Sequence, residues 1–400
     1  MTEPLILDNI CEFIIDTKHK TPKFTEFGYP CIRTPNIGRG YFILANAKYV
    51  DEASYIEWTT RATPSENDLV LAREAPVGNV AIIPPNLKVC HGQRTVLIRP
   101  DNNKVNPNYL MYLMLGDEIQ AKMHSMASGA TVAHLNMSDI RALNIPELPD
   151  VHEQKKIAGV LKAYDNLIEN NNRRIAILED MAQSLYQEWF VNFRFPGHQN
   201  TKFKESSSGL ILKGWEVKVF GDLVDFRRDS VKKGLVEKNT PYMGLEHFPR
   251  KSIALSEWEL VEEIGSSKLE FKKGDVLFGK IRPYFHKVGV AQTEGLCSSD
   301  TFVWRAVNDN LNALVSCIAS SNSFVAHSTQ TSQGTKMPRA NWNVLKEYGV
   351  CVPDNDLLDK FQNATGPMIE QIIVLSNKQR NLKMQRDLLL PQLISGTVNI

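Results

Sequence analysis

The sequence predicts an α+β fold: two similar mixed α/β domains separated by a long antiparallel two-helix coiled coil, with an internal pseudo-two-fold repeat. Two observations carry this prediction. A heptad-patterned segment at residues 157–189 returns 204 residues later, and heptad spacing of this length is typical of a long helix with one apolar seam. Short matches at a nearly constant offset also link the globular stretches that precede the two segments.

The repeat divides the chain into five segments. They are a first domain at residues 1–150, a first long helix at 151–195, a linker at 196–214, a second domain at 215–355 and a second long helix at 356–400. In the first domain, turn signals separate strand-like pieces at residues 41–44, 68–72, 80–83 and 95–98. A helix is predicted over residues 108–126, and a Gly-rich loop follows at 128–135.

The first long helix carries an apolar seam with alternating steps of four and three residues. Its members are Ile157, Leu161, Tyr164, Ile168, Asn171, Ile175, Leu178, Ala182, Leu185 and Trp189. A helix of this length spans roughly 50 Å. Three asparagines at residues 170–172 are poor helix formers and predict a bend. Two such helices in one chain most simply bury their seams against each other; the alternative is two unrelated surface helices, each packed on its own domain.

The second domain repeats the first at several separated points. Residues 7–13 match 220–226 at an offset of 213, residues 68–71 match 275–278 at 207, and Gly129 matches Gly334 at 205. Their common order predicts an internal duplication of about 205 residues. Proline suits the first turn of a helix, so the second long helix is expected to begin near Pro367 and to end by Pro391, after a short helix at 357–364.

Composition sets the broad class of the protein. Apolar residues make up 42% and charged residues 23% of the chain, and the net charge is +1. We expect a cytoplasmic protein, because the sequence offers neither a secretory signal nor 18 consecutive apolar residues. The six scattered cysteines form no CxxC pair, which favours reduced thiols and no metal site. Near-neutral charge means that any DNA contact needs basic residues gathered on one face, or a partner that shares it.

Motifs of catalytic sites are missing. Residues 274–280 (GDVLFGK) resemble a phosphate-binding loop, but Ile281 stands where a hydroxyl residue should hold magnesium. Neither Gly-x-Ser-x-Gly nor His-Glu-x-x-His occurs, and neither does the Asp/Asn-Pro-Pro-aromatic tetrapeptide of amino-methyltransferases. We therefore expect no catalytic residue and no metal, and we favour a binding protein over an enzyme.

Polar and cationic residues gather in the duplicated loops. Arg and Lys donate to guanine edges or phosphates, Thr and Tyr contact either, and Gly129 and Gly334 let the loop backbone approach a phosphate. The alternative for each residue is a solvated surface charge or a structural ion pair. The candidates for DNA contact are Arg33, Arg73, Arg94, Thr131, His134, Lys280, Arg282, Tyr284, Lys287, Lys336 and Arg339.

Three further stretches have a recognisable pattern. They are residues 153–157 (EQKKI), 184–191 (SLYQEWFV) and 386–396 (RDLLLPQLISG). With GAT at 129–131, Ile145-Pro146 and GWE at 214–216, their order and the duplication make the chain resemble the specificity (S) subunits of type I restriction–modification systems. The resemblance covers essentially the whole chain, although Pro367 faces Ala163 in the repeat and makes the two helices unequal.

The resemblance implies a concrete function. Each domain would be a target recognition domain that reads one half of a bipartite double-stranded DNA target. The helices would be conserved spacer regions that set the gap and dock two methyltransferase (M) subunits, while restriction/translocase (R) subunits complete the complex. S-adenosylmethionine, ATP and Mg would belong to those partners, and this chain would bind none of them. The spacer and docking residues would be Ile157, Leu161, Ile168, Leu178, Leu185, Ile372, Leu375, Leu382 and Leu389.

Two other functions remain open on the sequence. One is the specificity subunit or portion of a different restriction–modification assembly, in which a fused partner both cuts and methylates. The other is a catalytic protein or a purely structural coiled coil.

Overall fold

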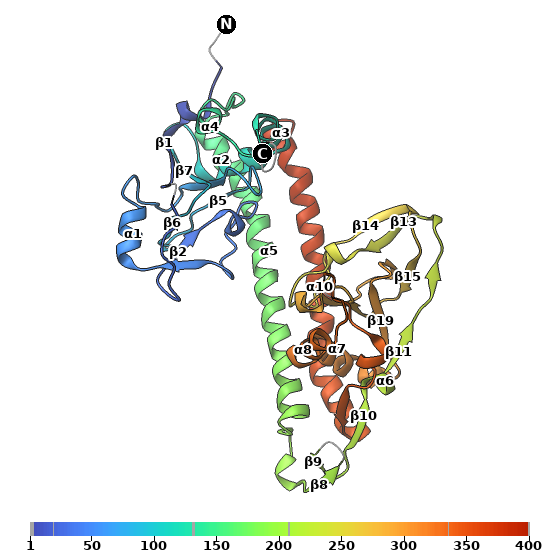
Figure 1. The fold of residues 1–400 in the computed structure, drawn as a ribbon. Coiled ribbons are helices and arrows are strands. Elements are labelled where there is room, and N and C mark those ends of the chain that lie inside the picture. The colour runs from blue at the N-terminus through green and yellow to red at the C-terminus, as the bar shows by residue number, and fades with distance from the viewer. Residues whose placement is uncertain (1–3, 19, 130–132, 207–208, 335, 399–400) are drawn as a thin grey trace. The chain divides into compact units, whose positions relative to one another are not determined.

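The chain forms two compact units, and the boundary between them falls within both long helices. The first unit contains residues 1–166 and 384–400, and the second contains residues 167–383. This computed structural model describes residues 4–18, 20–129, 133–206, 209–334 and 336–398. Figure 1 shows the two long helices, α5 (Val151–Tyr186) and α10 (Asn355–Ile394), and the mixed domain in each unit. None of the described helices is long and apolar enough to cross a bilayer.

The first domain contains two small sheets. An antiparallel sheet has the strand order β1-β7-β4-β5, and a second sheet has the order β3-β2-β6, in which β2 and β6 run parallel. The strands are β1 (Cys11–Asp16), β2 (Tyr29–Ile32), β3 (Lys48–Val50), β4 (Leu69–Ala72), β5 (Val80–Ile82), β6 (Cys90–His91) and β7 (Thr95–Pro100). The helices are α1 (Glu52–Trp58), α2 (Pro107–Leu115), α3 (Asp117–Met126) and α4 (Met137–Arg141).

The second domain has the same plan. Its main antiparallel sheet has the order β11-β19-β16-β17, and a larger sheet, β12-β15-β18-β13-β14, again holds one parallel pair, β13 with β18. These strands are β11 (Val224–Arg227), β12 (Ser230–Val231), β13 (Gly234–Met243), β14 (Glu259–Ile264), β15 (Lys268–Phe271), β16 (Val276–Gly279), β17 (Val288–Val290), β18 (Gly295–Cys297) and β19 (Thr301–Ala306). The helices are α6 (Phe220–Leu223), α7 (Asn312–Ser320), α8 (Asn322–Gln330) and α9 (Trp342–Leu345). Matching strand orders and parallel pairs confirm the predicted duplication.

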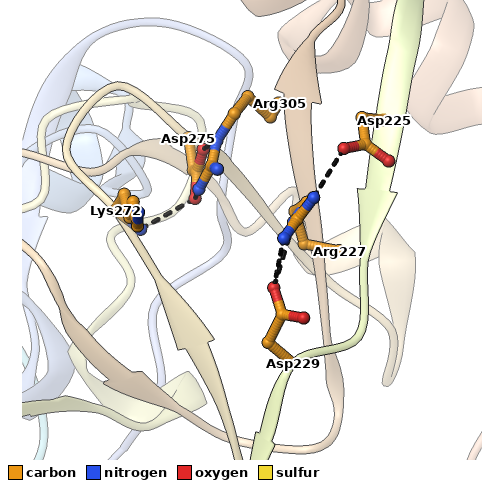
Figure 2. Close-up of polar contacts among 6 residues, drawn as sticks. All are labelled: Asp225, Arg227, Asp229, Lys272, Asp275 and Arg305. Atoms are coloured by element: carbon orange, nitrogen blue, oxygen red, sulfur yellow. Dashed lines mark hydrogen bonds and ion pairs between the residues drawn. The ribbon is translucent and has the colours of Figure 1, made fainter.

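A buried ion pair recurs in both domains at equivalent positions. In the second domain, Arg305 donates two hydrogen bonds to Asp275, at 2.7 and 2.8 Å, and the Asp275 side chain is only 1% exposed (Figure 2). In the first domain, Arg99 donates to Asp68 at 2.8 and 2.7 Å. Both aspartates also accept a backbone N–H from three residues earlier in the turn before the strand. The pair fixes this turn against the neighbouring strand of the sheet.

Each long helix begins beside an aspartate that caps it. Asp150 Oδ1 accepts from the backbone N–H groups of His152 and Glu153, at 2.8 and 2.9 Å. Asp354 Oδ1 accepts from the N–H of Leu357 at 3.0 Å. Such caps satisfy N–H groups that have no partner within the helix. The two aspartates are 204 residues apart, the same separation as the two seams.

A glutamine near the start of each long helix fastens the domain that precedes it. In the first unit, Gln154 Oε1 accepts from the N–H of Asn106 at 2.7 Å. In the second unit, Gln362 Oε1 accepts from the N–H of Ala313 at 2.9 Å. Because the donor is a backbone group in both cases, the attachment does not depend on which side chain the domain carries there.

The two long helices pack antiparallel in a single register. In the second unit, Gln379 donates to Asn172 Oδ1 at 2.7 Å, and the Phe190 and Phe361 rings lie 4.8 Å apart. The residue numbers in each pair add up to 551. The same relation holds in the first unit, where Arg386 donates to the Asp165 carboxylate at 2.7 Å. Antiparallel pairing is therefore confirmed, and the alternative of two unrelated surface helices is wrong.

Several local predictions are wrong. Helix α10 runs through Pro367 and Pro391 rather than between them. Helix α5 is continuous across its three asparagines, and the bend at this point stays a prediction. Pro367 is exposed while Phe361 and Ile372 are buried, so packing of the opposite face offsets the cost of about 3 kcal/mol for an interior proline. Asn171 is 8% exposed, so burial likewise overrides its low helix propensity.

The other differences from the predicted secondary structure concern short elements. The helix predicted at 108–126 breaks at Gly116 into α2 and α3. Residues 41–44 form no strand and make one isolated bridge at Phe42. A hairpin, β8 (Phe203–Ser206) with β9 (Gly209–Leu212), lies inside the predicted linker, and β10 (Glu216–Val219) pairs with β20 (Gly349–Val352).

A buried histidine should make the first domain acid-sensitive. His91 is 2% exposed, and burial lowers its pKa from 6.5 to about 4. The unfolded chain therefore binds this proton below about pH 6.5, whereas the folded domain does not until about pH 4, so stability falls across that window by up to about 3 kcal/mol. The unfolding free energy of wild type and His91→Gln, measured between pH 7 and 4, should diverge as pH falls. Parallel curves would contradict the assignment.

Candidate nucleic-acid interface

A closed loop lies between α3 and α4 in the first domain and contacts the residue that follows β4. The N–H of Leu135 donates to the carbonyl of Arg73 at 2.9 Å, and the N–H of Arg73 donates to that of Arg94 at 3.0 Å. Ser128 and His134 close the loop by exchanging backbone hydrogen bonds of 3.0 and 2.9 Å. The chain thus brings three of the predicted site residues together: Arg73, Arg94 and His134.

The second domain repeats this geometry bond for bond. The N–H of Ala340 donates to the carbonyl of Lys280 at 2.9 Å, and that of Lys280 donates to Asp300 at 2.8 Å. Gln333 and Arg339 close the loop by exchanging bonds of 3.0 and 2.8 Å. Gly334 has φ +100°, and a Cβ there would come 3.2 Å from the Met337 carbonyl oxygen, so this turn favours glycine.

The cationic side chains near the first loop differ in their exposure and in their contacts. Arg94 is the most exposed, with 60% of its side chain in solvent, and it pairs with Glu74. Arg73 is half-buried and its Nε donates to the Leu135 carbonyl at 2.9 Å. Arg33 lies at the end of β2, where its guanidinium stands 5.6 Å from the Phe24 ring. Thr131 lies outside the described residues.

The second loop borders a hollow of about 560 Å³ with cationic and aromatic walls. Lys280 Nζ lies 4.8 Å from the centre of the Phe302 ring and donates to the Ser299 carbonyl at 2.6 Å. Burial lowers the pKa of this ammonium group. Arg339 is 55% exposed and stands 3.4 Å from Asp300. The hollow is lined by Lys280, Phe302, Gln333, Gly334, Met337, Arg339, Ala340, Asn341 and Trp342.

The remaining candidates of the second domain lie around the same loop. Arg282 donates its N–H to the Pro338 carbonyl at 2.7 Å and has φ +49°. Lys336 is exposed on the loop itself. Tyr284 is 51% exposed and lies in the next turn (Pro283–Phe285). Lys287 follows that turn, half-buried, with its ammonium bound to the Leu245 carbonyl.

Residues that sequence reasoning missed also belong to this surface. Gln333, Asn341 and Trp342 line the hollow, and Arg250 lies 4.0 Å from the centre of the Phe285 ring. Asn341 matches Asn136 at the same offset as Gly334 matches Gly129, so the repeat offered a signal for Asn341 and the residues next to it. Arg250 had no such signal, because it comes from a distant segment.

Comparisons with known proteins show what this chain is similar to. Residues 6–180 match the family model described as "Type I restriction modification DNA specificity domain". The MjaIX specificity subunit of Methanocaldococcus jannaschii is 26% identical over 372 residues, covering 90% of this chain and 84% of that protein. The chain is thus similar to type I specificity subunits over most of its length.

Further relatives agree with this placement. The EcoDI specificity subunit of Escherichia coli is 25% identical over 283 residues, which cover 65% of this chain and 62% of that protein. The crystal structure of the type I S subunit from M. genitalium matches 98% of this chain and 97% of its own, with a TM-score of 0.59 at 14% identity. That likeness supports the fold.

The two duplicated loops are held by equivalent backbone hydrogen bonds but differ in their side chains. The backbone bonds make Arg94 equivalent to Asp300, so one loop carries a cation where the other carries an anion. The repeat offset places Met137 opposite Trp342, an aliphatic side chain opposite an aromatic one. Two loops that are held by equivalent bonds and carry different side chains are suited to contact two different sequences.

The side chains of the helix seams are largely covered by other parts of the chain. Ile157, Leu161, Ile168, Ile372 and Leu375 are buried, and Leu178, Leu185, Leu382 and Leu389 are half-buried. A partner that docks on the helices would meet a different set of apolar groups. These exposed residues are Leu167, Ile177, Met181, Val374, Met384 and Leu388.

Proposed function

We propose that this chain is the non-catalytic DNA-recognition subunit of a type I restriction–modification complex, in which each domain reads one half of a bipartite target. The observation that carries the proposal is the duplicated loop, which has one backbone geometry and two different sets of side chains. Cationic groups at each loop supply phosphate contacts, and neighbouring polar groups supply base contacts.

The helix pair would set the gap between the half-sites and dock the methyltransferase subunits. Its single register supports a spacer role, because packed helices hold a fixed separation. The seam residues would act by holding the helices together, and the exposed apolar side chains of α5 and α10 would face the partner. S-adenosylmethionine, ATP and Mg would be bound by the methyltransferase and restriction subunits.

Mapping adenine methylation at base resolution tests the function. DNA from cells that express this chain with its neighbouring methyltransferase should carry a two-part methylated motif with a fixed unspecified gap. A continuous motif would favour an assembly with a fused partner, and the absence of new methylation would contradict the proposal.

Cations of the second loop should contribute to DNA affinity in a salt-dependent way. Lys280→Met and Arg339→Gln are each expected to weaken binding of the complex, and each lost phosphate contact should reduce the slope of log K against log salt by about 1. The control is Arg173→Gln, because Arg173 is exposed on α5 and pairs with Glu169 of its own helix. Unchanged slopes in both loop variants would remove these residues from the interface.

A further inference from the structure

A segment of the second domain touches both long helices within the second unit. This strap, residues 249–258, connects the short turn Leu245–His247 to β14. Ile253, Ala254 and Leu255 in its middle are at most 9% exposed. It is therefore a packed element of the domain rather than a loose loop.

The strap meets α5 at a half-buried carboxylate. Glu179 Oε1 accepts from the Ser252 hydroxyl and from the Ile253 N–H, both at 2.7 Å. Burial raises the pKa of Glu179, whereas these hydrogen bonds lower it. A half-buried carboxylate with two donors from one segment helps to hold that segment in place, because hydrogen bonds to a charged group are among the stronger ones.

On α10 the strap meets two cations. The guanidinium of Arg380 stands 3.9 Å from the centre of the Trp258 ring, and Lys383 donates to Glu257 at 2.9 Å. The Lys383 pair is largely exposed and contributes little. The stacked Arg380 is the stronger contact, because it covers the face of a tryptophan.

The polar groups of the strap match those of the helix pair in one orientation. Glu179 and Lys383 are 204 residues apart, so they occupy equivalent positions of the two helices with opposite charges. The hydroxyl and N–H donors of the strap face the carboxylate, and its own Glu257 faces the ammonium. Exchanging the two helices would place donors against a cation and an acid against an acid.

From the strap, contacts continue to the sheet that carries the recognition loop. The N–H of Val290 donates to the Ile253 carbonyl at 3.1 Å, which joins the strap to β17. A Cβ at Gly289 would come 2.4 Å from Leu255 Cγ, so the glycine allows this close approach. Strand β17 pairs with β16, and Lys280 directly follows β16.

We propose that the strap is a positioning device, with Glu179 and Arg380 as positioning residues that fix where the second recognition domain sits on the helix pair. The inference rests on the proposed function, in which the helices set the gap between half-sites. A domain that is fixed at one position on the helices reads its half-site at one distance from the other half-site. A domain that is released from that position also reads half-sites at slightly shorter or longer gaps.

The test is methylation by the full complex with its methyltransferase, on DNA with the natural gap and with gaps one and two base pairs shorter or longer. Wild type should strongly prefer one gap. Glu179→Ala with Arg380→Met should reduce that preference by about tenfold, the scale of losing hydrogen bonds to one charged group. Glu179→Gln keeps an acceptor oxygen for both donors and should retain the preference.

A control variant and the wild-type result distinguish failure of the strap proposal from failure of the proposed function. Arg173→Ala alters an exposed charge of α5 that does not touch the strap and should leave the preference unchanged. Wild-type gap preference in the double variant would overturn the strap proposal alone. If wild type methylates no bipartite target, the proposed function falls and the strap proposal with it. If the double variant does not fold, Arg380→Met alone must broaden the gap preference, and an unchanged preference overturns the proposal.

Discussion

Replacing Arg305 with methionine is expected to destabilise the second unit by about 3 kcal/mol. The substitution leaves the carboxylate of Asp275 buried with one remaining backbone donor, and removing one partner of a buried ion pair typically costs 3–5 kcal/mol. We take the low end because 34% of the Arg305 side chain is in solvent. Chemical denaturation of the purified chain measures the loss.

Two further variants test the reason for this loss. Asp275→Asn combined with Arg305→Met removes the charge and should recover most of the stability. Arg227 pairs with Asp225 and Asp229 nearby in Figure 2, but on the surface, so Arg227→Met should change stability little. An equal loss in Arg227→Met and Arg305→Met would show that burial of the pair is not the cause.

Replacing Leu375 with aspartate should unfold the second unit or leave it only marginally stable. Leu375 is fully buried in the core that α10 shares with α5 and the second domain. Truncating a buried leucine already costs about 2–5 kcal/mol, and an unpaired carboxylate adds to this. Thermal unfolding and co-purification with the methyltransferase should both report the defect.

The neighbouring residue supplies a matched control. Val374 is 44% exposed on the same helix, and Val374→Asp should shift the melting temperature only slightly. A Leu375→Asp protein that melts like Val374→Asp would contradict burial of the seam.

Periodicity made the helices and the duplication predictable, and local chemistry was less informative. The seam from Ile157 to Trp189 and its copy predicted the helix pair, because apolar residues with a period of 3.5 are typical of long helices that pack along one seam. Pro367 misled because tertiary packing outweighed local propensity. The loops at Gly129 and Gly334 were found from the repeat, whereas Arg250 and the Glu179 contact join segments far apart in sequence and left no pattern.

The glutamine attachment bears on how such a protein can change over generations. Gln154 and Gln362 each hold a domain by a backbone N–H, so substitutions within the domain leave that joint intact. The buried Asp–Arg pairs likewise brace the sheets away from the recognition loops. Loop residues can therefore change without altering these attachments, whereas an exchanged second domain would have to keep the strap contacts to Glu179 and Arg380.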